Sequence, residues 1–206
     1  MEAYKTVRAS SEFTIVEKKS EFIGYCAPVK TEAEAIAFVN SIKKKHSDAR
    51  HNVYAYQLRE GFASRYSDDG EPHGTAGMPV LDSIRKSGLT DVAVVVTRYF
   101  GGILLGTGGL VRAYTAAASG AIKEAGVAEV GVYALVELKT DYSDYQRVMP
   151  IVSSIGARTD NSDFGSEVVL SLSVRAELAD GFIADVVEAT NGRVIAKKTG
   201  EICDFI

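Results

Sequence analysis

The chain has 206 residues and a formal net charge of −4, with 46% hydrophobic and 24% charged residues. This composition excludes a disordered or fibrous protein. No apolar run approaches the roughly 18 residues that a membrane span needs, and two cysteines, Cys26 and Cys203, are too few for a disulfide framework or a zinc cage. We therefore expect a cytoplasmic protein with no membrane partner, built from one large or two small domains.

Residues 1–132 alternate short strands with helices. Apolar runs predict the strands, and helical spacing between capping residues and glycines predicts the helices. In chain order, the expected elements are a β-hairpin of Phe13–Val16 and Phe22–Val29, a helix from Thr31 to Lys45, a strand at Val53–Leu58, a loop at Glu60–Gly74, a helix at Thr75–Ser87, a strand at Val92–Val96 and a helix at Gly109–Ala125. Because Val92–Val96 is continuously apolar, we expect it to be buried on both faces.

The remaining residues follow the order βαββαβ. The expected elements are strand Val132–Leu138, a helix around Tyr145–Val152, strands Arg158–Asn161 and Val168–Val174, helix Ala179–Thr190 and strand Arg193–Lys198. This order is the split-βαβ, ferredoxin-like pattern. We therefore predict an α+β protein of two domains, residues 1–132 and 133–206.

The charge differs between these two parts. Residues 1–132 carry 16 basic and 15 acidic side chains, whereas residues 133–206 carry 7 and 12. An acidic surface repels the phosphates of a nucleic acid. If the protein binds nucleic acid, the N-terminal part should bind it, and the acidic C-terminal part is a candidate contact for a protein partner.

The segment SDDGEPHGTAG at residues 67–77 crowds titratable groups between turn residues. Asp68, Asp69, Glu71 and His73 offer four potential metal-binding or acid–base groups within six positions, which fits a ligand or metal loop. The alternative is a set of turns whose carboxylates bind their own backbone, with Thr75 capping the next helix. No established metal motif is present, so the sequence leaves a metal undecided and identifies no catalytic residue.

A second segment, RYFGGILLGTGGLVRAY at residues 98–114, has five glycines among residues 101–109. A glycine-rich turn at a helix N-terminus exposes backbone N–H groups that attract phosphate or carboxylate. The candidate nucleic-acid or anion-binding residues are Arg50, His51, Arg98, Tyr99, Gly101, Gly102, Gly106, Thr107, Gly108, Gly109 and Arg112. The alternative is close packing, since glycine and alanine let a helix lie tightly on a sheet. The two interpretations are compatible.

Two arginines make this hypothesis specific. We expect the guanidinium of Arg98 to emerge at the sheet edge beside Gly101, and we place Arg112 in the first helical turn, where the helix dipole does not favour a cation. Each then needs an anion, either a bound phosphate or one of Asp68, Asp69 and Glu71. An internal pair would join the two segments in one site. We predict a bound phosphate for Arg112 and a mixture of both for Arg98.

The segment SDDGEPHGTAG followed by VAVVVTRYFGGILLGTGGLVRAY resembles the bacterial branch of the IMPACT family, and the similarity extends back to HSDARHNVYAY at residues 46–56. The resemblance implies an N-terminal domain with the ribosomal-protein-like α/β fold of elongation factor G and the GHMP kinases. It also implies a ferredoxin-like C-terminal domain. Eukaryotic relatives regulate translation by competing for the ribosome-associated activator of a general-control kinase. For bacterial members, binding to nucleic acid or the ribosome is the usual proposal.

Three functions remain open. The leading hypothesis is a non-enzymatic, translation-associated regulatory factor without a cofactor, which binds RNA or the ribosome through its N-terminal domain. The alternative is an enzyme or sensor that binds a phosphorylated small molecule at the glycine-rich loop, with or without a metal. The third is a protein-interaction module, for which the sequence offers no distinguishing feature.

Overall fold

The computed structural model describes residues 3–205. The chain forms two compact units, one of Tyr4–Glu129 and one that takes in the chain from Val130 onward together with Ala3. We call them the N-terminal and C-terminal units and describe each by itself. Within the described residues, no helix is both long enough and apolar enough to cross a membrane.

The N-terminal unit is built on a five-stranded antiparallel sheet. The strand order is β2 (Ser11–Glu17), β3 (Ser20–Pro28), β6 (Val92–Tyr99), β4 (His51–Gln57) and β5 (Ser64–Ser67). The predicted burial of Val92–Val96 on both faces is confirmed, because β6 lies at the centre of the sheet and these five residues have no exposed surface. The segment predicted as a loop at Glu60–Gly74 contains the short helix η1 (Glu60–Phe62) and β5, an edge strand that the sequence analysis missed.

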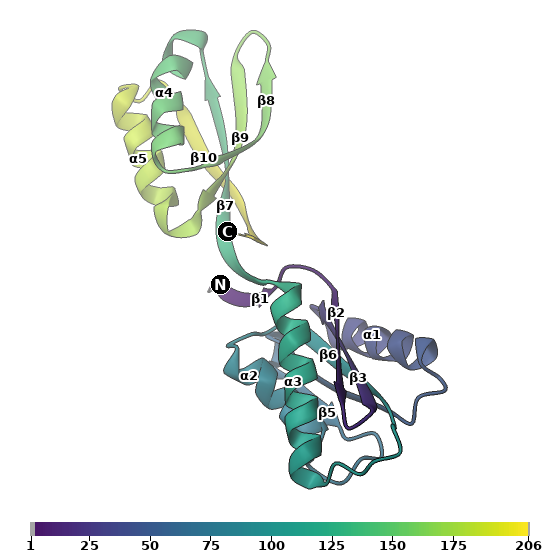
Figure 1. Ribbon diagram of the computed structural model, residues 1–206. Helices are drawn as coiled ribbons and strands as arrows, with labels where there is room; N and C mark the ends of the chain where they lie inside the picture. Colours follow the sequence, from purple (N-terminus) through teal and green to yellow (C-terminus); the bar gives the residue numbers. More distant parts are fainter. Residues whose placement is uncertain (1–2, 206) are drawn as a thin grey trace. The chain divides into compact units, whose positions relative to one another are not determined.

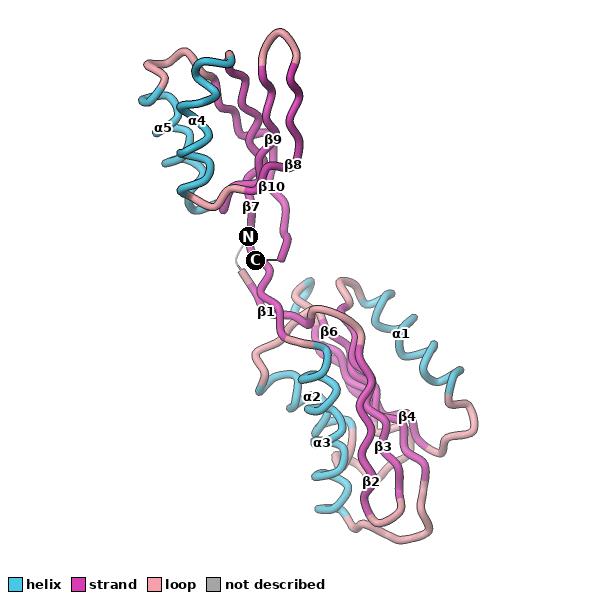
Figure 2. The backbone as a smooth tube through the Cα atoms, turned by 45° about the horizontal axis from the view of Figure 1, so that its top comes forward, coloured by secondary structure: helices cyan, strands magenta, loops and turns pink. Residues whose placement is uncertain are grey.

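Helices cover both faces of this sheet. Helix α1 (Glu32–Lys45) packs on one face, while α2 (Gly77–Lys86) and α3 (Thr107–Ala125) pack on the other, as Figures 1 and 2 show. At the start of α1, the hydroxyl of Thr31 accepts a hydrogen bond from the Glu34 amide and caps the helix. Helix α3 begins at Thr107, two residues earlier than predicted, so its first turn ends before Arg112.

Small residues set the distance between α3 and the sheet. Ala117, Ala118 and Ala121 have no exposed surface, and a Cβ atom at Gly24 of β3 would overlap the carbonyl oxygen of Ala117. Backbone therefore packs directly on backbone here. The close-packing interpretation of the alanine-rich helix is confirmed.

The C-terminal unit has the predicted element order βαββαβ. Its elements are β7 (Val127–Thr140), α4 (Tyr142–Ser154), β8 (Arg158–Phe164), β9 (Val168–Arg175), the short helix η2 (Ala176–Leu178), α5 (Ala179–Ala189) and β10 (Ile195–Phe205). Hydrogen bonding places the strands in the antiparallel order β8-β9-β7-β10. Strand β1 (Tyr4–Val7) belongs to the N-terminal unit. Helices α4 and α5 lie on the same face of this sheet (Figure 1).

The contact at Gly24 yields a test of the N-terminal unit. Gly24→Ala should destabilise the protein by about 1–3 kcal/mol, because the added methyl group forces the helix and the sheet apart. Gly181→Ala on α5 is the control, since a Cβ there meets no atom within 4 Å and should stabilise the helix by about 0.5–1 kcal/mol. Urea denaturation of the full chain measures both. Equal effects of the two substitutions would contradict the close packing of α3.

Candidate functional site

One end of the N-terminal sheet gathers both sequence motifs. Strand β6 ends there at Tyr99 and β4 begins there at His51, because the two strands are antiparallel with His51 opposite Arg98. Five segments meet at this end: the β2–β3 turn, residues 46–50, residues 68–76, residues 100–106 and the N-terminus of α3. We call it the loop end.

A buried ion pair joins the two motifs. Glu71 Oε1 accepts hydrogen bonds from Arg98 Nη1 at 2.6 Å and from the Tyr114 hydroxyl at 2.7 Å, and all three residues are buried. For Arg98, for which a mixture of an internal pair and a bound phosphate was predicted, the internal pair is present and ties the two segments together. The expected position of Arg98 at the sheet edge is wrong, because β6 has neighbours on both sides and this residue is only 6% exposed.

Aromatic rings and a histidine surround this pair. The Arg98 guanidinium carbon lies 5.4 Å from the ring centre of Phe22 and 5.5 Å from that of Phe100. His51 Nδ1 lies 2.8 Å from the carbonyl oxygen of Asp69, which fixes Nδ1 as the donor, and its Nε2 is 3.9 Å from Glu71 Oε1. Burial, then the adjacent Glu71 carboxylate, raises the pKa of Tyr114 well above its ordinary value. Its hydroxyl therefore remains a hydrogen-bond donor.

Asp68, and not Thr75, caps helix α2. The Asp68 carboxylate accepts hydrogen bonds from the amides of Gly74, Ala76 and Gly77 at 2.8–3.2 Å. Thr75 instead donates its hydroxyl proton to the carbonyl oxygen of Pro72. The predicted Thr75 cap is wrong because the 68–76 loop folds back and presents a charged acceptor to the first helical amides, where a carboxylate is favoured.

The other titratable groups of this loop face separate partners. Asp69 binds Lys43 Nζ and the Asn52 amide, each at 2.7 Å, whereas His73 is exposed and lies 3.7 Å from Asp68 Oδ2. Among residues 3–205, no three His, Cys, Asp or Glu side chains are arranged to hold a metal ion. The metal-loop interpretation of Asp68, Asp69, Glu71 and His73 is therefore not supported. Asp68 binds the backbone of the loop itself and of the start of α2, whereas Asp69 and Glu71 tie the loop to other elements of the unit.

The glycines of the second motif serve packing and backbone conformation. The Gly101 amide donates to Ser20 Oγ at 3.1 Å, and a Cβ at Gly101 would overlap the backbone of Lys19 in the β2–β3 turn. Gly102 and Gly106 have φ angles of +84° and +72°, which favour glycine. Gly106 is the N-cap residue of α3, and among residues 3–205 no side chain accepts a hydrogen bond from the first amides of this helix. Its first amides are left to solvent or to a ligand.

Arg50 and Arg112 differ from Arg98. Both are exposed, and neither forms an ion pair within the part of the chain that the structure describes. The placement of Arg112 in the first turn is wrong, because it follows Thr107 by five residues and lies in the second turn of α3. Its guanidinium nonetheless reaches back along the helix, with Nη1 3.7 Å from the position of a Cβ at Gly108.

Tyr99 lies outside this group. Its hydroxyl donates to Asp48 Oδ1 at 3.0 Å and contacts His46 Nδ1 at 2.9 Å, while the Tyr25 hydroxyl contacts His46 Nε2 at 2.7 Å. The pKa of His46 is lowered, mainly by burial and to a smaller extent by the nearby charge of Lys45. Tyr99 alternates with Arg98 along β6 and so faces the α1 side of the sheet, away from the predicted anion site.

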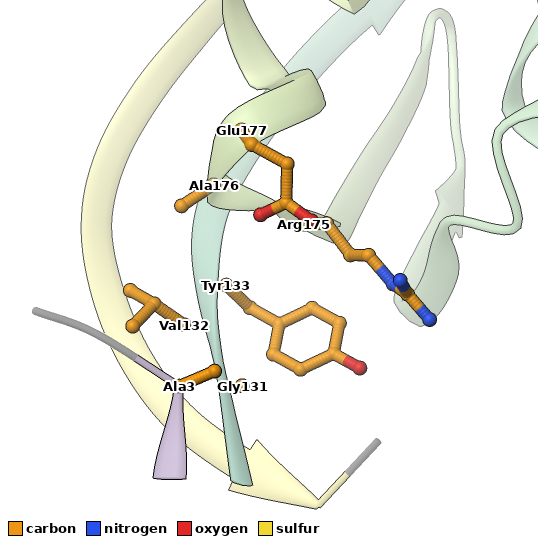
Figure 3. Close-up of a pocket in the computed structure, with 7 residues that line it drawn as sticks. All are labelled: Ala3, Gly131, Val132, Tyr133, Arg175, Ala176 and Glu177. Atoms are coloured by element: carbon orange, nitrogen blue, oxygen red, sulfur yellow. The ribbon is translucent and has the colours of Figure 1, made fainter. Parts of the chain in front are cut away.

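The C-terminal unit contains a small cavity of about 210 Å³ near the start of its sheet. Its lining residues are Ala3, Gly131, Val132, Tyr133, Arg175, Ala176 and Glu177. Figure 3 shows the Tyr133 ring and the Arg175 side chain extending toward the same side, with the Glu177 carboxylate nearby. None of the sequence-predicted site residues lies there.

The geometry thus defines a two-unit α+β protein whose N-terminal unit presents a glycine-rich loop, the N-terminus of α3 and the exposed arginines Arg50 and Arg112 at one end. Comparison with known families agrees with that class. Residues 18–122 match the Impact N-terminal domain, and residues 138–193 match a domain of unknown function, DUF1949. The chain belongs to the IMPACT family.

Relatives match along most of the chain. IMPACT family member YvyE of Bacillus subtilis is 36% identical over 98% of this chain and 93% of its own length, and IMPACT family member YigZ of Escherichia coli is 35% identical over 87% and 90%. The Protein IMPACT homolog of Dictyostelium discoideum is 41% identical, but over only 45% of this chain and 28% of its own length. A solved structure described as a hypothetical protein is 31% identical, covers 97% of this chain with 98% of its own, and has a TM-score of 0.63.

The two arginines should respond differently to substitution. Arg98→Ala leaves a buried, unpaired Glu71 and should cost about 3 kcal/mol or more, whereas Arg112→Ala should leave the melting temperature nearly unchanged. The double variant with Arg98→Met and Glu71→Gln should be more stable to unfolding than Arg98→Ala, because no unpaired charge remains buried. Thermal and urea denaturation measure these effects, and a strongly destabilised Arg112→Ala would contradict the assignment.

The Asp68 cap should give a pH-dependent stability. Burial opposes the charge of this carboxylate, but hydrogen bonds from Gly74, Gly77 and Ala76 offset it and hold its pKa below the ordinary value. The stabilisation is therefore complete above the unfolded pKa of about 3.9 and is lost as the pH falls through the lower folded pKa.

We expect Asp68→Ala to cost about 1–2 kcal/mol at pH 7 and less in acid, where wild type loses the same charged cap. The control is Thr75→Ala, whose cost should not change with pH because threonine does not titrate. Urea denaturation at both pH values gives the comparison. A cost of Asp68→Ala that stays constant into acid would argue against the charged cap.

Proposed function

We propose that this protein is a non-enzymatic, translation-associated regulatory factor of the cytoplasm, which binds RNA or the ribosome through its N-terminal domain. We further infer that this domain has the ribosomal-protein-like fold of elongation factor G and the GHMP kinases, and that the C-terminal domain is ferredoxin-like. The βαββαβ order and the strand order β8-β9-β7-β10 support the second inference. Membership in the IMPACT family supports a regulatory role.

The observation that carries the proposal is the pair of exposed arginines at the loop end. Arg112 lies beside the uncapped N-terminus of α3, and Arg50 directly precedes β4. An arginine without an internal carboxylate can form charge-assisted hydrogen bonds with a phosphate. Phosphates in a nucleic acid are regularly spaced, so several separate cations suit it better than a single small ligand.

The C-terminal domain has a different part in this proposal. Its 12 acidic and 7 basic side chains disfavour contact with phosphates. Several of the basic ones are already paired: Arg193 binds Asp144, Arg158 binds Asp160 and Asp204, and Lys198 binds Glu201. We propose that this domain contacts a protein partner while the loop end contacts RNA.

Salt dependence tests the phosphate contacts. RNA affinity should fall linearly with salt on logarithmic axes, and Arg50→Ala and Arg112→Ala should each lower the slope by about 0.7, the value for one single-stranded phosphate contact. The matched control is Arg85→Ala, which removes an exposed cation from the last turn of α2, far from the loop end. Fluorescence anisotropy with labelled RNA measures the affinities. A flat salt response would remove the basis of the proposal.

Co-sedimentation addresses the larger target. The protein should sediment with ribosomal particles at low salt and leave them at high salt, and Arg112→Ala should leave at lower salt than wild type. Sedimentation that is unaffected by both salt and Arg112→Ala would point to contacts outside the loop end.

A further inference from the structure

The loop between β6 and α3 exposes large apolar side chains. Phe100 is 44%, Ile103 43% and Leu104 82% exposed, whereas the adjacent Leu105 is buried in the core. Leu105 therefore anchors the loop in the core, whereas much of the surface of the three preceding apolar residues faces solvent. Exposed apolar side chains grouped in one short loop mark a candidate interaction surface.

The buried Arg98 side chain supports the ring of Phe100. The Phe100 ring contacts the Arg98 guanidinium, which also contacts Phe22 and is hydrogen-bonded to Glu71. This cation–π contact stabilises the orientation of the ring. Gly102 has no side chain, and apart from its chain neighbours no described atom lies within 4 Å of where its Cβ would be. Phe100 is therefore an oriented aromatic ring, 44% exposed, in a loop that is open at Gly102.

Cations flank this surface. Lys18 and Lys19 occupy the β2–β3 turn, whose backbone is in direct contact with Gly101. Both have positive φ angles, +47° and +64°, at positions where asparagine or glycine is favoured. Neither lysine forms an ion pair within residues 3–205, although the exposed Glu17 and Glu21 adjoin the turn. Arg112, on the helix that follows the loop, is a third unpaired cation.

We propose that the loop end binds unpaired RNA, with one base stacked on Phe100 and the adjoining phosphates contacted by Lys18, Lys19 and Arg112. Ile103 and Leu104 extend the apolar surface to the neighbouring base or sugar. The inference rests on the proposed function and adds the structural class of the RNA. Only unpaired bases can reach such a ring, because a duplex buries their faces in its own stack.

Charge favours RNA over a protein as the occupant. A protein that covered only the apolar loop would bring three cations to its border without a partner for them. An RNA strand supplies a phosphate for each cation and a flat π face for the ring, which is the combination that proteins use to bind single-stranded nucleic acids.

The test compares an unstructured RNA with a perfectly paired hairpin of equal length, by fluorescence anisotropy on the full chain. Wild type should prefer the unstructured RNA. Phe100→Leu keeps the apolar character but removes stacking and should weaken this binding by about ten-fold or more, whereas Phe100→Tyr should retain it. Phe62→Leu is the matched control, because Phe62 is 93% exposed in the β4–β5 connection, at the opposite end of the sheet.

The outcomes separate this inference from the proposed function. Equal affinity for both RNAs, or full affinity in Phe100→Leu, would overturn the inference. The proposed function would survive that result if Arg112→Ala still lowered the salt slope. Phe100→Leu could instead keep its RNA affinity and lose binding to RNA-free ribosomal proteins. That result would assign the loop to a protein contact. Wild type that binds no RNA would overturn the inference, and it would overturn the proposed function as well if the protein also failed to sediment with ribosomal particles.

Discussion

The buried ion pair between Glu71 and Arg98 is the interaction on which the loop end depends. It joins two segments that are 27 residues apart in the chain, and the Tyr114 hydroxyl brings in helix α3. A buried charge is tolerated only when it is paired and hydrogen-bonded. Residues 68–76, strand β6 and α3 must therefore reach their positions together, and the orientation of the exposed Phe100 ring follows from where this pair fixes Arg98.

The glycine-rich motif was open to two interpretations, close packing and anion binding, and the structure assigns separate residues to each. Gly101 is required by the close approach of the β2–β3 turn, and Gly102 and Gly106 are required by their backbone angles. These constraints shape a loop that contributes one buried leucine to the core and leaves its other large side chains exposed. Packing thus explains why the glycines are there, while the unpaired cations and the exposed ring suggest what the resulting surface contacts.

Sequence patterns predicted the periodic elements well, because burial imposes a regular spacing on strands and helices. The fully buried Val92–Val96 and the order βαββαβ are examples. The patterns could not predict that Arg98 would face inward, since its partner Glu71 comes from a loop and no periodicity links the two. The prediction that Thr75 caps α2 was wrong for a similar reason. Threonine was favoured because it is close in sequence to the helix, whereas the fold brings in Asp68, which precedes Ala76 and Gly77 by eight and nine residues. The role of Tyr114 was missed because an alanine-rich helix offers no sign of a polar contact.

The remote cap of α2 also bears on how the protein folds. The first amides of α2 obtain their acceptor only after residues 68–76 have closed into their turns, because the Asp68 carboxylate also holds the Gly74 amide. An isolated ten-residue helix is marginal in water. Loop and helix therefore form one cooperative unit, and hydrogen exchange at the amides of Gly74 and Gly77 should proceed through the same opening event.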